Sequence, residues 1–384
     1  MRIVIYNSSS FGGCFDYGRE IHAAYRRHPQ VETCEWWVPA GAAPGVADPS
    51  VRRLFISDKP GIKNRLFRQL HFLLRTLFNP FLLFLRLSAA PDSVVILNDF
   101  EQLSAPVWVP FFRKFLSSRH RFVVLLHDPD RDAYPPSLRW TQVCMKALMS
   151  LADFAFYHDF LPDKNYYQSA RSCFLDLPHG IFRMPSPDPI CSRRIRELNP
   201  EGLKLMSIPG NIRPEKNYET AMEALKLLPD FALLIAGAPS NARVDVQAYK
   251  EKAAQLGVQN RVIWIERYLS AEELSAVMDC SDVLVLNYAD SFTSQSGILN
   301  VAAPYFKPLV VSDGPSSLAA VVRKFGIGTL VNAGGAASLA AAVASALSSS
   351  EENTAAWQRY LDFASWDRHA DIAMRSFQEN RLKK

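Results

Sequence analysis

The chain has 384 residues, which is too long for one ordinary hydrophobic core, so two domains are expected. Its hydrophobic content of 48% and charged content of 21% exclude an intrinsically disordered chain. The net charge is +5, and residues 1–182 hold the whole excess, with 21 basic against 16 acidic side chains. Most of that excess lies between Arg52 and Arg86, where Asp58 is the single acid. Such a surface predicts an anionic partner, either nucleic acid or a membrane.

The cysteines and the first residues predict a protein of the reducing cytoplasm. The six cysteines form no CxxC pair and no zinc-binding spacing, which excludes a disulfide framework and a structural metal site. The opening residues MRIVIYNSSS contain too short an apolar run for the core of a signal peptide. We expect them to form a buried strand instead.

Apolar runs of strand length alternate with longer helical stretches along the whole chain, a pattern that predicts parallel sheets with crossover helices. Leu177–Leu198, with four prolines, is predicted to be a linker. We therefore expect an α/β protein with two doubly wound, Rossmann-like domains facing across a cleft, residues 1–182 and 183–360, and a closing helix in residues 361–384 that packs back toward the first domain. The strands are expected at Ile3–Tyr6, Cys34–Val38, Leu54–Ile56, Val94–Leu97, Phe122–Leu126, Phe154–Tyr157, Leu203–Ile208, Ala232–Ala236, Val262–Ile265, Val283–Leu286 and Leu309–Val311.

The stretch Ser207–Asn217, SIPGNIRPEKN, is the most informative part of the sequence. It follows an apolar strand and precedes Tyr218–Leu228, whose apolar residues recur at helical spacing. Free N–H groups and the positive end of a helix converge at such a turn, which makes it a site for anions. Arg213 and Lys216 are placed to hold a diphosphate there. The alternative is that both are ordinary surface charges.

Several segments resemble, in this order and spacing, the glycosyltransferases of the GT-B fold, in particular the retaining family 4 type. GNIRPEKN is similar to the donor loop of that family, LLHDPD to a strand end that carries an active-site histidine, and GGCFDYGREI to a glycine-rich loop on the acceptor side. The other similar segments are FALLIAGA, RVIWIERYLSAEELSAVMDCSDVLVLNY, KPLVVSD, SWDRHADIAMRSF and LPHGIF.

The resemblance implies transfer of a sugar from a nucleoside diphosphate sugar to an acceptor bound by the first domain, with neither a metal nor a cofactor. Arg213 and Lys216 would neutralise the diphosphate leaving group. His127 would contact the donor sugar or stabilise the departing charge, although a strand-end histidine is often only structural. Gly12 and Gly13 would let backbone N–H groups approach the donor closely.

The sequence departs from the family pattern at one place. Two glutamates eight residues apart are usual there, and Thr293 and Val301 stand at their positions. The hydroxyl-rich segment DSFTSQSGILN is expected to bind the donor instead. Thr293, Ser294, Gln295 and Asn300 would give neutral hydrogen bonds to sugar or ribose. Ser296, Gly297 and Ile298 would open a helix whose N–H groups bind the diphosphate. The alternative for Ser296 is a simple N-cap, which is compatible with that role because a cap position frees the next amides.

Two acidic features have competing interpretations. Asp16 is a candidate general base if the reaction inverts configuration, and otherwise a helix-capping residue. Asp128-Pro129-Asp130 has the spacing of a metal-binding D-x-D motif, but that motif belongs to a single-domain architecture, so we expect a turn and no metal site.

The stretch Lys63–Leu87 predicts a helix with a basic stripe opposite Leu and Phe residues. Its arginines argue against a membrane-spanning helix, whereas peripheral contact with the inner face of the membrane suits this pattern. The alternative is a helix that packs its apolar face on the sheet. Nucleic-acid binding is not expected, because few stacking aromatics and polar residues are interleaved with the basic ones.

The sequence therefore predicts a cytoplasmic, metal-independent glycosyltransferase of surface polysaccharide or glycolipid assembly. Two alternatives remain, a non-catalytic sugar- or nucleotide-binding scaffold of the same fold and a nucleotide-sugar epimerase. The missing glutamates favour the scaffold, while an epimerase would need more carboxylates near the sugar.

Overall fold

The computed structural model describes residues 1–42, 48–58, 62, 64–128, 137–167, 172–199, 202–241, 243–347 and 350–379. Lys63, Pro129 and Asp130, which belong to predicted features, lie outside these ranges. The chain divides into two compact units. Unit 1 consists of Met1–Gly180 and Ser365–Lys384, and unit 2 is Ile181–Ala364.

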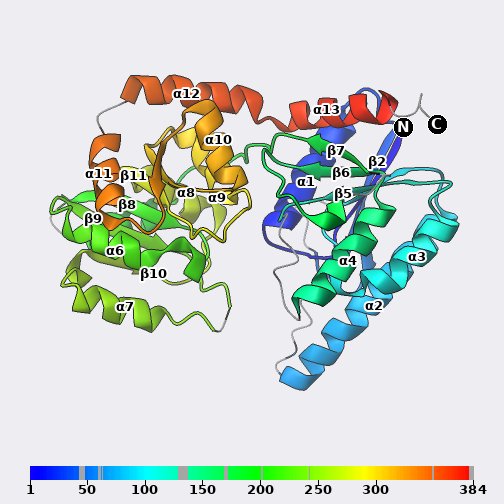
Figure 1. The fold of residues 1–384 in the computed structure, drawn as a ribbon, viewed down its shortest axis with the longest axis horizontal. Coiled ribbons are helices and arrows are strands. Elements are labelled where there is room, and N and C mark those ends of the chain that lie inside the picture. The colour runs from blue at the N-terminus through cyan, green and yellow to red at the C-terminus, as the bar shows by residue number, and fades with distance from the viewer. Residues whose placement is uncertain are drawn as a thin grey trace. The chain divides into compact units, whose positions relative to one another are not determined.

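Unit 1 is a parallel sheet with helices on both faces (Figure 1). Its strand order is β3-β2-β1-β4-β5-β6-β7. The strands are β1 Arg2–Tyr6, β2 Thr33–Pro39, β3 Val51–Phe55, β4 Val94–Leu97, β5 Arg121–Leu125, β6 Phe154–Tyr157 and β7 Cys173–Asp176. The helices are α1 Gly13–Arg27, α2 Arg65–Ala89, α3 Ala105–Phe115, α4 Leu138–Leu151 and α13 Trp366–Glu379.

Unit 2 repeats this plan with the strand order β10-β9-β8-β11-β12-β13. The strands are β8 Lys204–Pro209, β9 Phe231–Ala236, β10 Val262–Ile265, β11 Val283–Leu286, β12 Leu309–Asp313 and β13 Thr329–Asn332. The helices are α5 Pro189–Leu198, α6 Tyr218–Lys226, α7 Val246–Gln255, α8 Ala271–Cys280, α9 Gly297–Ala302, α10 Ser317–Phe325, α11 Ala336–Ala346 and α12 Ser350–Phe363.

Every strand expected from the sequence is present, and two further strands, β7 and β13, were not predicted. Both lie at the edge of a sheet. Their residues are mostly half-buried or exposed, so they lack the continuous apolar run of a central strand. The linker prediction was wrong in its second half, because Pro189–Leu198 forms α5, with Pro189 at the start of the helix and Asp188 as its N-cap.

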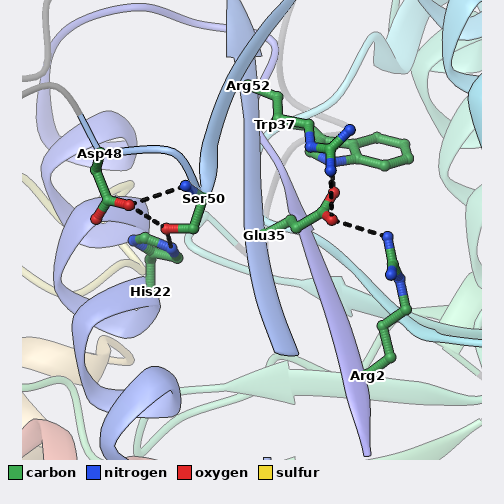
Figure 2. A network of polar contacts seen from close by, with 7 residues as sticks. All are labelled: Arg2, His22, Glu35, Trp37, Asp48, Ser50 and Arg52. Carbon is green, nitrogen blue, oxygen red and sulfur yellow. Dashed lines mark hydrogen bonds and ion pairs between the residues drawn. The ribbon is translucent and has the colours of Figure 1, made fainter. Parts of the chain in front are cut away.

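Ion pairs across β1, β2 and β3 neutralise part of the local positive charge (Figure 2). The Glu35 carboxylate on β2 accepts hydrogen bonds from Arg2 and Arg52, each at 2.9 Å, and from the Trp37 indole at 2.7 Å. Arg53 donates to the Ala42 carbonyl at 2.8 Å. Arg52 and Arg53 therefore stabilise this edge of the sheet, and four of the other basic residues of the stretch, Arg65, Arg68, Arg75 and Arg86, belong to α2.

Four histidines surround the buried ring of Tyr17 on α1. The centroid of that ring lies 4.5 Å from His127, 5.1 Å from His179, 5.6 Å from His158 and 5.8 Å from His369. The His369 ring nitrogens lie 3.1 Å from the Pro178 carbonyl and 3.0 Å from the Tyr25 hydroxyl, a pairing that suits a neutral imidazole. Burial lowers the pKa of His179 and the pKa of His369 to about 3.

This cluster predicts that unit 1 loses stability in mild acid. Below a pKa of about 6.5 the unfolded chain protonates these imidazoles, whereas the folded chain keeps His179 and His369 neutral down to about pH 3. The free energy of unfolding should therefore decrease as the pH is lowered, by up to about 1.4 kcal/mol per pH unit for each histidine. Urea unfolding followed by tryptophan fluorescence between about pH 7.5 and 5 measures this slope. The substitution His369→Gln should reduce it, and an unchanged slope would contradict the assignment.

Candidate functional site

Each sheet has one place where the strand order reverses, between β1 and β4 in unit 1 and between β8 and β11 in unit 2. Helices on the two sides of such a point diverge, so ligands of open parallel sheets bind there, beyond the carboxyl ends of the strands. In unit 2 this criterion selects the turn after β8, with Arg213 and Lys216, and the segment after β11.

These two segments of unit 2 are in direct contact. The Ala289 N–H donates to the Glu215 carbonyl at 2.7 Å. Gly210 has φ +85°, and a Cβ atom on it would lie 2.8 Å from Cδ1 of Ile298 and 3.3 Å from Nζ of Lys216. A glycine is thus required at this turn, both for its backbone conformation and for the close approach of α9.

Lys216 is buried at the end of the short 3-10 turn η5 (Pro214–Lys216). Its ammonium donates to the Pro209 carbonyl at 2.5 Å. No carboxylate within the described ranges forms an ion pair with it. Burial, with a smaller effect from the nearby Arg213, lowers the pKa of Lys216 to about 7. The protein therefore holds a cation at this turn without a fixed counter-charge.

Two further donors near this turn are buried without a partner in the described residues, Nε of Arg213 and Nε2 of Gln295. Buried donors in native proteins nearly always have a hydrogen-bond acceptor. Two donors without one therefore indicate a place where a ligand supplies the acceptors. The guanidinium of Arg213, the ammonium of Lys216 and the amide of Gln295 would all favour an anionic or oxygen-rich ligand.

The start of α9 differs from a simple capped helix. Ser296 occupies the N-cap position, but its side chain makes no capping hydrogen bond, and its hydroxyl lies 3.1 Å from the Tyr288 hydroxyl. Ser296 is therefore the N-cap residue by position, but its side chain does not cap the helix. The Ser296 N–H donates to the Gln295 side chain at 3.1 Å, while Gly297 is exposed at the first turn.

The remaining residues of this segment are placed differently. The carbonyls of Thr293 and Ser294 accept hydrogen bonds from the first N–H groups of α10, Ser317 at 3.1 Å and Leu318 at 3.4 Å. Asn300 is fully buried, and its side-chain oxygen accepts from the Tyr360 hydroxyl at 2.5 Å. Asn300 thus faces α12, whereas Ile298 reaches the turn after β8.

Asn287 is a residue of this edge that we did not select from the sequence. It follows β11 directly, is buried, and donates to the Ala333 carbonyl at 3.0 Å, while its own side-chain oxygen has no partner in the described residues. Its position immediately after a buried strand was the only signal in the sequence that pointed to it.

In unit 1 the reversal point carries a chain of amides that ends at His127. Nε2 of His127 lies 2.8 Å from Oδ1 of Asn98, so this nitrogen carries the hydrogen. The Asn98 amide in turn donates to Asn7 at 2.9 Å and to the Cys14 carbonyl at 2.7 Å. These contacts, together with the edge of the Tyr17 ring, fix the imidazole just after β5.

Gly12, Gly13 and Asp16 lie at the start of α1. Gly12 is the N-cap residue, with φ +83°, and both glycines are exposed. Asp16 lies inside the first turn and pairs with Arg19 at 3.0 Å, with 42% of its side chain exposed. The capping interpretation of Asp16 is therefore wrong, and its carboxylate accepts a hydrogen bond from Arg19 instead.

Glu101, after β4, is a buried carboxyl that the sequence did not single out. It accepts hydrogen bonds from the Tyr6 hydroxyl at 2.6 Å and from Asn79 of α2 at 3.1 Å. Burial raises the pKa of Glu101 to about 7. Among the described residues, no cluster of His, Cys, Asp and Glu has an arrangement suited to a metal ion, and Asp130 of the D-x-D motif lies outside them.

Comparison with known proteins gives a consistent result. Residues 192–360 match the family model "Glycosyl transferases group 1". No curated protein matches the sequence significantly.

Solved structures of the same fold cover nearly the whole chain. Sucrose-phosphate synthase from Thermosynechococcus elongatus is 15% identical, with a TM-score of 0.72 and full coverage of both chains. Anabaena HepE in complex with UDP and glucose is 13% identical, with a TM-score of 0.70, and the match covers 99% of this chain and 100% of that one. WaaG, a glycosyltransferase involved in lipopolysaccharide biosynthesis, is 14% identical, with a TM-score of 0.62 and coverage of 96% and 99%.

The buried ammonium predicts a distinctive pH dependence of stability. The cost of burying Lys216 is absent above pH 10.5, where the unfolded lysine also loses its proton, and is complete below about pH 7. Between these values the free energy of unfolding should rise with pH by up to about 1.4 kcal/mol per unit. The variant Lys216→Met should lose this contribution. Urea unfolding of both proteins at several pH values measures the difference. Lys226→Met, at the exposed end of α6, is the control and should keep the wild-type profile.

Proposed function

Because this chain belongs to the group 1 glycosyltransferases and has the GT-B fold, we propose that it transfers the sugar of a uridine diphosphate sugar to an acceptor, with the diphosphate bound by Arg213 and Lys216. The observation that carries the proposal is the buried ammonium of Lys216, which has no carboxylate partner in the described residues and lies beside the first turn of α9.

The nature of the donor is supported by the comparisons. The chain is a nucleotide-sugar-dependent enzyme of its family. Anabaena HepE, which shares the fold, was solved with UDP and with UDP-glucose. We therefore propose uridine as the nucleoside of the donor.

The chemistry needs positive charge where the leaving diphosphate forms. As the glycosidic bond breaks, negative charge grows on the diphosphate, and fixed cations stabilise it more than they stabilise the bound donor. Arg213 and Lys216 would supply this charge, with the amide of Gln295 and the first N–H groups of α9 as additional donors. Because Lys216 has a pKa of about 7 without ligand, an arriving diphosphate would favour its protonated form. This charge supports a reaction that needs no metal ion.

The proposals for the acceptor and the cellular location rest on one structural comparison and on the charge of the first half of the chain. WaaG acts in lipopolysaccharide biosynthesis, and the first half of the chain carries a basic excess next to apolar residues. We propose that the acceptor is a precursor of a surface polysaccharide or glycolipid, bound by unit 1 at the cytoplasmic face of a membrane.

Binding of UDP tests the donor site directly. UDP at about one hundred times its Kd should stabilise the wild-type protein by about 2.7 kcal/mol, seen as a rise in Tm. Arg213→Ala and Lys216→Met should abolish most of the rise and lower kcat/KM for sugar transfer by about 100-fold or more. The controls are Arg243→Ala and Lys226→Met, two exposed cations of the same unit. An undiminished rise in the Arg213 and Lys216 variants would place the nucleotide elsewhere.

His127 should act on the transfer step and not on nucleotide binding. We expect His127→Ala to lower kcat by about 100-fold while the rise of Tm with UDP stays at the wild-type value. Asn98→Ala, which removes the hydrogen-bond acceptor of His127, should have a smaller effect of the same kind. Full activity of His127→Ala, measured as acceptor-dependent release of UDP, would exclude a catalytic role.

A further inference from the structure

Exposed apolar side chains are concentrated on three helices of unit 1. The described residues contain 20 large apolar side chains that are exposed, and 16 of them lie on α2, α3 and α4. Examples are Phe67 and Phe81 on α2, Phe111 and Phe115 on α3, and Val143 on α4. A patch of this extent on the outside of a folded unit marks a surface that another body covers.

The helix α2 turns its polar side toward the protein and much of its apolar side outward, which is the reverse of a helix that packs on a sheet by its apolar face. Its polar residues Thr76 and Asn79 are buried, with 6% and 0% of their surface exposed, and Arg75 donates to the Ser8 carbonyl at 3.2 Å. Phe81 is 55% exposed. Only the later part of the helix, with Leu83 and Leu87, packs into the core. Arg75, a member of the basic stripe expected from the sequence, therefore turns toward the protein.

The three helices form one continuous surface. They lie side by side on unit 1 (Figure 1). The Phe84 ring of α2 lies 5.8 Å and 6.2 Å, between ring centroids, from Phe112 and Phe115 of α3. Arg113 of α3 donates to the Ser150 hydroxyl of α4 at 3.4 Å. Contact with α3 and α4 thus extends the apolar surface beyond the stretch Lys63–Leu87.

The charge of this surface is entirely positive. The sequences of α2, α3 and α4 contain no Asp and no Glu. Exposed cations accompany the apolar residues, namely Arg68, Arg86, Arg113, Lys114, Arg139 and Lys146. Apolar side chains bordered by cations alone fit the interface of a bilayer that contains anionic lipids, where the former enter the acyl boundary and the latter meet the phosphates.

We propose that α2, α3 and α4 together form a docking face for the surface of an anionic lipid bilayer. This inference goes beyond the proposed sugar transfer and does not depend on it. A second copy of the chain fits poorly, because the same cations would then face one another. The stretch Leu66–Ala89 has 24 residues, contains an 18-residue window with a mean hydropathy of 1.3, and would be long enough to span a membrane. However, α2 is hydrogen-bonded to the folded unit through Arg75 and Asn79, which suits a helix lying along the interface.

The docking face also reaches the carboxyl ends of the strands of unit 1. Arg75 binds the segment after β1, and Asn79 binds Glu101 after β4 and the Ile56 N–H after β3. The polar side of α2 is therefore part of the reversal point, while its apolar side faces outward. A membrane bound to the outer side would lie next to the edge of the sheet at which ligands are expected.

Flotation of the full chain with lipid vesicles tests the proposal. The wild-type protein should float with vesicles of phosphatidylcholine and phosphatidylglycerol at low salt, bind pure phosphatidylcholine more weakly, and be extracted from the mixed vesicles by alkaline carbonate. Phe111→Ser and Phe115→Ser on α3 should each lower the partition coefficient about tenfold. The double variant Arg113→Gln/Lys114→Gln should lower it by about fivefold for each cation removed.

Matched controls are Ile190→Ser and Leu227→Ser, exposed apolar residues of unit 2, which should float like the wild type. The urea midpoint of each variant shows that it is folded without relying on UDP, so failure to float is distinct from failure of the donor site. The proposal is overturned if the wild-type protein stays at the bottom with anionic vesicles at low salt, if the α3 variants float normally, or if carbonate fails to extract it. It is also overturned if the α3 variants abolish a concentration-dependent dimer while the wild type shows no flotation.

Discussion

A lysine ammonium buried without a carboxylate partner in the described residues is the central physical feature of the proposed donor site. Desolvating Lys216 is unfavourable, and the low pKa of the group expresses that cost. The turn that encloses it needs a glycine at position 210, the contact of Ile298 and the hydrogen bond from Ala289 to Glu215. These features place the cation at the reversal point of the sheet, where helices on the two sides diverge and where a parallel sheet admits a ligand. Its burial thus lowers stability, and the proposed diphosphate would supply the counter-charge.

Unit 1 buries a carboxyl group, and not a cation, at its reversal point. The buried carboxyl of Glu101 requires polar neighbours, and α2 supplies one of them through Asn79. Turning the polar side of α2 inward forces its apolar residues outward, such as Phe78 and Phe81. The exposed apolar surface is therefore the direct consequence of polar contacts within the unit. The same helix connects the proposed lipid surface to the ends of β1, β3 and β4.

The sequence-based predictions succeeded where a structural feature is set by neighbouring residues in the chain, and failed where it is set by contacts with distant residues. The central strands were predicted because each is a run of apolar residues buried on both faces, as in Val94–Leu97 and Val283–Leu286. The edge strands β7 and β13 were missed because half-buried positions carry mixed residues. Side-chain capping was one of two roles expected for Ser296 from local spacing, yet its hydroxyl contacts Tyr288, whose side chain could not be placed from the sequence. The role of Arg213 and Lys216 stays a prediction, now supported by burial and by an unpaired Arg213 donor.

The amino-acid pattern was enough to predict that the protein is α/β, that it contains two parallel sheets, and that a strand, a turn with two cations and a helix follow one another at residues 203–228. Those properties are written in short-range patterns of apolar, glycine and charged residues. Three features became visible in the folded protein and not before: Asn98 fixes the ring of His127, Asn300 faces α12, and α2 turns its polar side inward. Each of these depends on contacts between residues far apart in the chain, and the energy of such contacts is set by burial that no local pattern specifies.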